Sequence, residues 1–153
     1  MIKWPNDIMI NGKKLCGILT EMKAQQDSVD FVVVGIGINV TTNIKHLPKG
    51  ASSIKEELQR RGVKLEVSRI ELTKKILEKL DEYYILLNKK GFDQIIDMWK
   101  DMTAMLGSRV KVTLQNRSFE AQAHDIDPDG ALVVRLDSGV LEKISSGDVV
   151  IIR

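Results

Sequence analysis

The chain has 153 residues and a mass of 17.2 kDa, of which 43% are hydrophobic and 29% charged. This composition is typical of a globular domain and argues against a disordered chain. There are 23 Lys and Arg residues against 21 Asp and Glu, so the net charge is only +2. Proteins that bind nucleic acid through its phosphates carry a stronger basic excess, and we therefore expect no nucleic-acid partner.

Neither a membrane nor the secretory pathway fits this sequence. The longest apolar runs, such as residues 31–34, are too short to span a bilayer, and the N-terminus lacks the apolar core of a signal peptide. We expect a cytoplasmic protein with no membrane partner. Cys16 is the one cysteine, which excludes an internal disulfide and any multi-cysteine zinc site.

Residues 7–40 predict a meander of three antiparallel strands. Residues 7–10 run into Asn11-Gly12, which is a strong signal for a short hairpin turn. The returning strand is expected over residues 14–22 and the turn after it over residues 24–30. A run rich in β-branched residues, 31–40, then predicts the third strand.

Residues 52–106 are expected to be helical, because their apolar residues follow the helical period. Two capping boxes mark helix starts, and glycines mark the ends. We expect the third helix to stop at Gly107, with Trp99 and the methionines of the helices in the core. The two capping boxes are Ser53 with Glu56 and Ser68 with Glu71.

Residues 107–153 return to a strand period, with clusters of turn residues at short intervals. Five short strands in about 50 residues predict a small closed or nearly closed β-barrel. The expected fold class is α+β: a mostly antiparallel sheet with helices on one face, followed by this barrel. The domain boundary is placed between residues 1–106 and 107–153.

Two glycines interrupt an otherwise strong strand in Val34-Gly35-Ile36-Gly37-Ile38-Asn39. Because side chains alternate along a strand, Gly35, Gly37 and Asn39 share one face. That face is a smooth floor without Cβ atoms, on which a flat ligand could lie, with the amide of Asn39 at its end. The alternative is that a helix packs closely on the glycines.

Lys14 leads into an apolar strand and could present its ammonium to a phosphate or carboxylate. Strict alternation would put Lys14, Cys16 and Ile18 on one face, and Leu15, Gly17 and Leu19 on the other. The alternative for Lys14 is an exposed lysine at a hairpin edge. We expect Cys16 to be a small core residue, because no histidine lies near it in sequence to activate the thiol.

The segment Lys3-Trp4-Pro5-Asn6-Asp7 brings several unusual residue types together. Asn6 could read a base edge, and Asp7 could hold Mg²⁺ directly or through water. The alternative is a plain Asn-Asp turn beside a core tryptophan.

Taken together, KWPND, KKLCGIL and GIGINV occur in an order and at a spacing that resemble the catalytic domain of biotin protein ligases. The helical stretch with GFDQIIDMWK and the terminal segment at LGSRVKV are similar to the same family, so the resemblance covers essentially the whole chain. It implies an SH3-like barrel at the C-terminus. It also implies the family's reaction, in which biotin and ATP give biotinyl-5′-adenylate and pyrophosphate. Biotin then passes to a lysine of a carboxyl-carrier protein.

The resemblance also implies residue roles and cofactors. Lys14 is the expected catalytic residue, contacting the biotin carboxylate and the α-phosphate, where it would stabilise growing negative charge. The expected cofactors are ATP, biotin and Mg²⁺, with Mg²⁺ held by Asp7. The implied biotin-binding residues are Lys14, Gly17, Gly35 and Gly37, and the implied ATP-binding residues are Lys3, Trp4, Asn6, Asp7 and Asn39.

The sequence departs from the family at one place. The family's Arg/Gly-rich loop, which folds over biotin and the adenylate, lies upstream of KWPND, and these 153 residues contain no Gly-Arg-Gly-Arg run. We therefore expect a C-terminal part of a ligase, weak or inactive alone, that self-associates or pairs with an N-terminal half. The rival hypothesis is a non-catalytic module in which residues 107–153 bind a partner.

Overall fold

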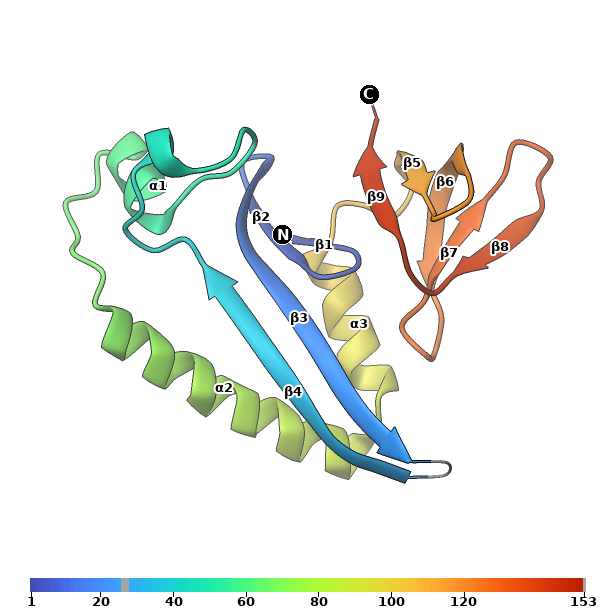
Figure 1. Ribbon diagram of the computed structural model, residues 1–153, viewed down its shortest axis with the longest axis horizontal. Helices are drawn as coiled ribbons and strands as arrows, with labels where there is room; N and C mark the ends of the chain where they lie inside the picture. The colour runs from blue at the N-terminus through green and yellow to red at the C-terminus, as the bar shows by residue number, and fades with distance from the viewer. Residues whose placement is uncertain (26–27, 153) are drawn as a thin grey trace. The chain divides into compact units, whose positions relative to one another are not determined.

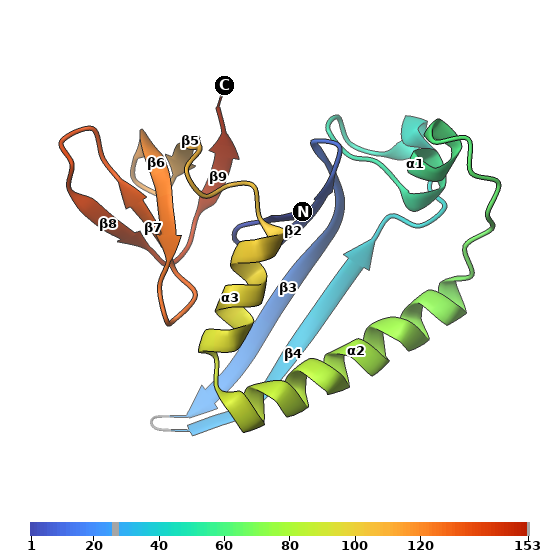
Figure 2. The ribbon, with the colours of Figure 1, turned by 180° about the vertical axis from the view of Figure 1, so that it is seen from behind.

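The computed structural model describes residues 1–25 and 28–152 (Figures 1 and 2). Its strands and helices follow the predicted order of strands, helices and strands. No helix within the described ranges is long and apolar enough to cross a membrane. The elements are β1 (Ile2–Lys3), β2 (Asp7–Ile10), β3 (Lys13–Gln25), β4 (Ser28–Ile38), the 3-10 helix η1 (Ile44–His46), α1 (Ile54–Arg60), α2 (Arg69–Lys90), α3 (Asp93–Met102), β5 (Arg109–Thr113), β6 (Ser118–Ile126), β7 (Leu132–Arg135), β8 (Leu141–Ile144) and β9 (Asp148–Ile151).

The chain forms two compact units. One unit is Asn6–Thr73, and the other combines Met1–Pro5 with Lys74–Arg153. The boundary predicted at residue 106 separates two domains along the sequence, whereas these units are groups of residues that pack together. The predicted boundary therefore stays a prediction. The same holds for the prediction that the helices cover one face of the first sheet.

The first sheet has the strand order β1-β2-β3-β4, and the predicted antiparallel meander is confirmed in β2, β3 and β4. Asn11 and Gly12 have φ of 49° and 73°, the left-handed conformation that a two-residue hairpin turn requires. The turn predicted over residues 24–30 is wrong at its ends, because β3 runs to Gln25 and β4 begins at Ser28. The rest of it, residues 26–27, lies outside the described residues.

Both capping boxes are confirmed. Ser53 Oγ accepts from the backbone N–H of Glu56 at 3.3 Å, and Ser68 Oγ accepts from that of Glu71 at 3.3 Å. The third helix ends at Met102, earlier than the expected stop at Gly107. Of the helical residues expected in the core, Trp99 packs against it, whereas Met102 is 46% exposed.

The second sheet is antiparallel with the order β8-β7-β6-β5-β9, so the predicted barrel is not closed in the described residues. Residues 145–147 join the two end strands, and they pass close against β5. An ideal Cβ on Gly147, at φ 137°, would lie 2.8 Å from the carbonyl oxygen of Thr113. β9 pairs with β5 and not with β8. Because only residues 145–147 join β8 to β9, the sheet has to curl, yet its two end strands do not pair within the part of the chain that the structure describes.

The core of the larger unit forms beneath this second sheet. Alternate residues of β5 and β7 are fully buried, as the strand period requires. Trp4 at the start of the chain and Ile96 of α3 belong to the same cluster. The fully buried strand residues are Val110, Val112, Ala121, Ala123, Leu132, Val134 and Val149.

Leu132→Ala should destabilise the protein by about 2–5 kcal/mol, because it removes buried methyl groups and leaves a cavity. Urea unfolding would measure this loss. Leu141→Ala in neighbouring β8 is the matched control, since Leu141 is 52% exposed. Equal losses in the two variants would contradict the assignment of the core.

Candidate functional site

An irregularity in strand pairing decides where Lys14 points. The β2–β3 register pairs Ile8 with Cys16 but Met9 with Lys14, so Leu15 is an extra residue on β3. A bulge of this kind shifts the alternation of side chains by one position. The prediction that Lys14 and Gly17 occupy opposite faces is therefore wrong, and the end of the Lys14 side chain lies over Gly17.

Lys14 is held in place by an ion pair. Its Nζ lies 2.5 Å from Oδ1 of Asp7, whose side chain is only 14% exposed. An ideal Cβ on Gly17 would lie 3.2 Å from both Cε and Nζ of Lys14. A side chain at position 17 would crowd the ammonium, so the glycine leaves the space that the lysine occupies.

The glycine floor predicted from the sequence is present. Gly17 pairs with Gly37, and Leu19 pairs with Gly35, which puts the three glycines on one face of neighbouring strands. The atoms nearest to an ideal Cβ on Gly35 or Gly37 belong to Leu19 and Gly17, at 3.6 Å or more. The neighbours within 4 Å thus come from β3 rather than from a helix, which contradicts close helix packing as the reason for these glycines.

Asn39 and Lys14 are joined through one segment of backbone. The N–H of Ser52 donates to the carbonyl of Lys14 at 2.9 Å, and the carbonyl of Ser52 accepts from Nδ2 of Asn39 at 3.1 Å. The N–H of Lys14 donates to Gly50 at 2.8 Å. We call residues 50–52 the strap. It fixes the backbone at Lys14 and the side chain of Asn39.

Asn6 and Asp7 lie where β2 begins. Nδ2 of Asn6 donates to the carbonyl of Ile18 at 2.7 Å, and the N–H of Ile18 returns a bond to the carbonyl of Asn6 at 2.9 Å. The amide of Asn6 is therefore fixed against β3, and its neighbour Asp7 meets Lys14. The structure thus brings the predicted site residues Asn6, Asp7 and Lys14 together with the glycines in one unit.

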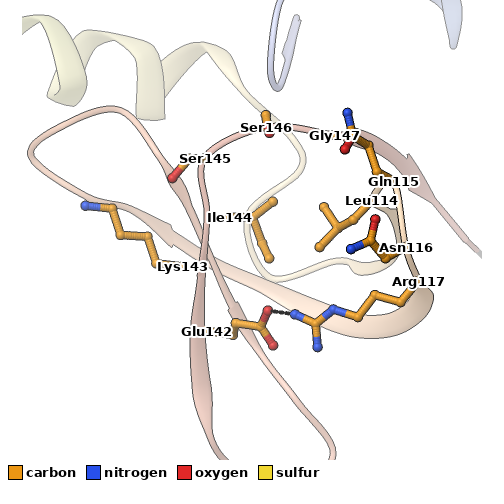
Figure 3. A pocket seen from close by; sticks show the side chains of 10 residues that line it. All are labelled: Leu114, Gln115, Asn116, Arg117, Glu142, Lys143, Ile144, Ser145, Ser146 and Gly147. Atoms are coloured by element: carbon orange, nitrogen blue, oxygen red, sulfur yellow. Dashed lines mark hydrogen bonds and ion pairs between the residues drawn. The ribbon is translucent and has the colours of Figure 1, made fainter.

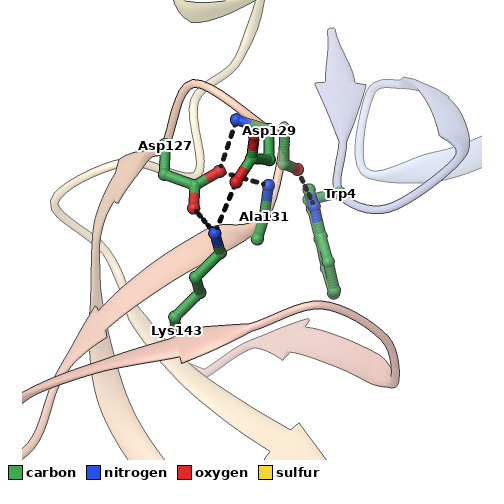
Figure 4. A network of polar contacts seen from close by, with 6 residues as sticks. Trp4, Asp127, Asp129, Ala131 and Lys143 are labelled. Carbon is green, nitrogen blue, oxygen red and sulfur yellow. Dashed lines mark hydrogen bonds and ion pairs between the residues drawn. The ribbon is translucent and has the colours of Figure 1, made fainter.

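Lys3 and Trp4 belong to the other compact unit. Nζ of Lys3 lies 3.7 Å from Oδ1 of Asp148. Trp4 is buried in the core, and its Nε1 donates to the carbonyl of Gly130 at 3.0 Å (Figure 4). Because the indole is buried in the core, it supports neighbouring residues by packing and does not present an open surface.

The turn that receives the Trp4 indole is itself tied down. Asp127 accepts from the backbone N–H groups of Asp129 and Ala131, each at 2.9 Å, and its other oxygen pairs with Lys143 (Figure 4). Lys143 also contacts Asp129 at 2.8 Å. The hydrogen bond to Lys143 lowers the pKa of Asp127, and the two aspartates raise the pKa of Lys143 to about 12.

Cys16 is buried, as predicted for a core residue. Burial, and to a lesser extent the carboxylate of Asp7, raises the pKa of its thiol. The thiol is therefore protonated at neutral pH and is a poor nucleophile.

A separate open groove of about 770 Å³ lies in the second sheet, between the β5–β6 turn and the β8–β9 connection (Figure 3). Leu114 and Ile144 form its apolar part, and Arg117 pairs with Glu142 at one side. Lys14 is not among its lining residues. The groove lies within residues 107–153, the segment to which the rival hypothesis assigns partner binding.

The sequence did not predict a role for Ser52 and Glu57, although Ser52 bonds to the backbone of Lys14 and Glu57 bonds to Ser52. Ser52 and Glu57 are both buried, and Ser52 Oγ donates to Glu57 at 2.6 Å. The capping box at Ser53 marks the start of α1 but carries no signal for its neighbour Ser52. A glutamate on a short charged helix likewise gives no local sign that it is buried.

Two family models match the chain at its two ends. The Biotin/lipoate A/B protein ligase family matches residues 1–39, and the Biotin protein ligase C terminal domain matches residues 105–151. The chain belongs to the biotin protein ligase family. The segments with Lys14 and the glycine floor fall within the first match, and the second sheet falls within the second.

Curated biotin ligases match along nearly the whole chain. The Bifunctional ligase/repressor BirA of Bacillus subtilis is 37% identical over 149 residues, which are 97% of this chain and 45% of that protein. A Biotin--[acetyl-CoA-carboxylase] ligase of Mycobacterium tuberculosis is 32% identical over 153 residues, with 99% and 53% covered. The chain thus spans about half the length of these relatives.

A solved structure supports the fold. The biotin protein ligase from Aquifex aeolicus in complex with biotin and ATP matches with a TM-score of 0.73 at 24% identity. The match covers 99% of this chain and 61% of that one. A relative with the same fold therefore binds biotin and ATP.

Gly17→Ala should displace the Lys14 ammonium from Asp7, because the added methyl group would lie 3.2 Å from Cε and Nζ. The NMR signals of the Lys14 side chain report the change. Gly35→Ala is the matched control on the same floor, since its nearest neighbour is at 3.6 Å. Lys14 signals that move equally in the two variants would contradict this geometry.

Proposed function

We propose that this chain carries the lysine-bearing part of a biotin protein ligase active site. The reaction joins biotin to ATP, giving biotinyl-5′-adenylate and pyrophosphate, and then transfers biotin to a lysine of a carboxyl-carrier protein. The observation that carries the proposal is the Lys14 ammonium, held by Asp7 over Gly17 next to the glycine floor. We also propose a cytoplasmic location, where ATP and carrier proteins occur.

The proposed chemistry gives Lys14 one clear task. In the first step an oxygen of the biotin carboxylate attacks the α-phosphorus, and the bond to the β-phosphate breaks to release pyrophosphate. Negative charge grows on the α-phosphate oxygens, and a fixed ammonium stabilises it. In the second step an acceptor amine attacks the acyl carbon and AMP leaves. The pair with Asp7 would hold Lys14 ready before the anionic substrates arrive.

The remaining site residues take supporting roles in this proposal. Gly17, Gly35 and Gly37 would form the surface on which biotin lies. Asn6, Asp7 and Asn39 would contact ATP; the amides of the two asparagines are already oriented by bonds to backbone carbonyls. The resemblance also assigns Lys3 and Trp4 to ATP binding, and that assignment stays a prediction.

Magnesium is proposed to enter with ATP. The carboxylate of Asp7 is a hard oxygen ligand of the kind Mg²⁺ prefers. Among the described residues no group of three or more His, Cys, Asp or Glu side chains could hold a metal ion. The single carboxylate of Asp7 fits a Mg²⁺ ion that is held mainly by phosphate oxygens and water.

The β3–β4 hairpin supports the proposal that this part of the ligase needs a partner. Val32, Val33 and Val34 point to alternating faces, and each is about half exposed. Both faces are therefore apolar and open, which is unusual for a stable sheet. We propose that the part of the ligase that lies upstream in the family covers this hairpin. A second copy of the chain is the alternative occupant. The exposed apolar residues are Leu19, Met22, Val29, Phe31, Val32, Val33, Val34 and Ile36.

The groove in the second sheet favours a second candidate function. A module that binds a partner through residues 107–153 would use the surface lined by Leu114, Arg117 and Ile144. Such a module would not need Lys14, so ligand binding separates the two functions.

Biotin with MgATP should raise the melting temperature of the chain, and Lys14→Ala should abolish the rise. A ligand that binds only the native state stabilises it, and about 1 kcal/mol corresponds to roughly 2–4 °C in a domain of this size. Differential scanning fluorimetry measures the shift. Lys45→Ala, at an exposed lysine of the same unit, should keep it. An absent shift in the unaltered chain, or one that survives Lys14→Ala, would favour the binding module.

Adenylation should be weak or absent with this chain alone and should rise when the upstream part of a ligase is supplied as a second polypeptide. Biotin- and ATP-dependent pyrophosphate release measures it. Val33→Asp should prevent the gain by placing a charge on the hairpin, whereas Val140→Asp, at an exposed position just before β8, should not. Full pyrophosphate release by the pure chain would refute the need for a partner.

A further inference from the structure

Glu57 is a buried carboxylate that contacts no proposed substrate. Its residue is 2% exposed. Its Oε1 accepts from Oγ of Ser52 at 2.6 Å, and its Oε2 accepts from Nδ2 of Asn11 at 2.7 Å. Burying a charge is costly unless hydrogen bonds compensate. The two bonds, together with an ion pair between Oε1 and Arg60 at 3.4 Å, compensate the buried charge.

One of these partners belongs to the strap. Ser52 bonds through its backbone to Lys14 and to Asn39, so it contacts two of the proposed site residues at once. The strap also forms a parallel bridge with β3, between Ala51 and Lys14. Fixing the side chain of Ser52 thus fixes the backbone from which Lys14 projects.

The other partner belongs to the turn before β3. Asn11 has φ of 49°, in the left-handed region that asparagine adopts more readily than most residues other than glycine. Its side-chain bond to Glu57 ties this turn to α1. Lys14 follows three residues later. One carboxylate oxygen of Glu57 therefore holds the turn before Lys14, and the other holds the strap residue that bonds to the backbone of Lys14.

We propose that Glu57 is a positioning residue for Lys14. It clamps the Asn11 turn and the Ser52 strap together, and the bulged start of β3 is held between them. The clamp itself is a matter of structure, whereas its importance for catalysis rests on the function proposed above. Asn11, Ser52 and Glu57 would then act as one unit.

The ionisation of Glu57 fits this role. The hydroxyl of Ser52 is the main cause that lowers its pKa, and Asn11, Arg60 and Lys13 contribute in the same direction. The carboxylate is therefore charged at neutral pH and accepts both bonds. Since the folded pKa is below the ordinary value, this stabilisation is present above the ordinary pKa and is lost as the pH falls through the folded value.

The test compares Glu57→Ala with the matched control Glu56→Ala on the same helix. Amide hydrogen exchange is followed by NMR at Lys14, whose N–H donates to Gly50, and at Ile18, whose N–H donates to Asn6. The proposal predicts that exchange at Lys14 rises by on the order of tenfold in Glu57→Ala, as expected when a buried hydrogen-bonding group is removed. Exchange at Ile18 should change much less, and Glu56→Ala should leave both amides unchanged.

Two milder variants keep the test decisive if Glu57→Ala does not fold. Ser52→Ala removes only the hydroxyl and should reproduce the selective effect at Lys14. Glu57→Gln keeps the shape and one acceptor oxygen, so it should restore part of the protection. Equal increases at Lys14 and Ile18 would show a general loss of stability and overturn the proposal, as would unchanged exchange at Lys14.

A ligand measurement separates this proposal from the function itself. If biotin with MgATP shifts the melting temperature of the unaltered chain, Glu57→Ala should reduce that shift at least severalfold, and Glu56→Ala should retain it. A full shift in Glu57→Ala would overturn the positioning role. If the unaltered chain shows no shift, the proposed function fails, and the exchange data still decide whether Glu57 holds Lys14.

Discussion

The one-residue bulge at Leu15 is the constraint on which the candidate site depends. With regular pairing, Lys14 would project from the face opposite Gly17, away from Asp7. The extra residue shifts the alternation of side chains along β3 by one position. The ammonium of Lys14 then lies over Gly17 and against the carboxylate of Asp7. A bulge leaves backbone groups outside the ladder, so it needs support from elsewhere. The strap supplies that support by bonding to both the N–H and the carbonyl of Lys14.

The features that the sequence predicts correctly are those that depend on interactions between residues close together in the chain. The Asn11-Gly12 turn follows from the need for left-handed backbone, and Ser53 and Ser68 cap helices through a bond to a residue three positions on. The glycine floor followed from the alternation of side chains along one strand. Each of these features depends on only a few neighbouring residues, and each is present in the structure.

The features that escaped prediction depend on contacts between distant residues. The bulge depends on how β2 registers with β3, and no residue type near Leu15 signals it. The burial of Glu57 depends on Asn11, which lies 46 residues earlier. The strand order of the second sheet depends on the pairing of β9 with β5, which joins residues as far apart in the sequence as Thr113 and Asp148. Long-range packing overrides local propensity in each case, so a single sequence without this packing could not reveal them.

The five residues Lys3-Trp4-Pro5-Asn6-Asp7 read as one motif, yet the structure divides them between the two compact units. Trp4 is committed to the core beneath the second sheet, where its indole reaches the Gly130 turn. Asn6 and Asp7 bond to β3 and to Lys14. The two ends of the motif therefore have different physical tasks: Trp4 anchors the core, and Asp7 holds the side chain of Lys14. A substitution at Trp4 would act first through the stability of that core, and a substitution at Asp7 first through the position of Lys14.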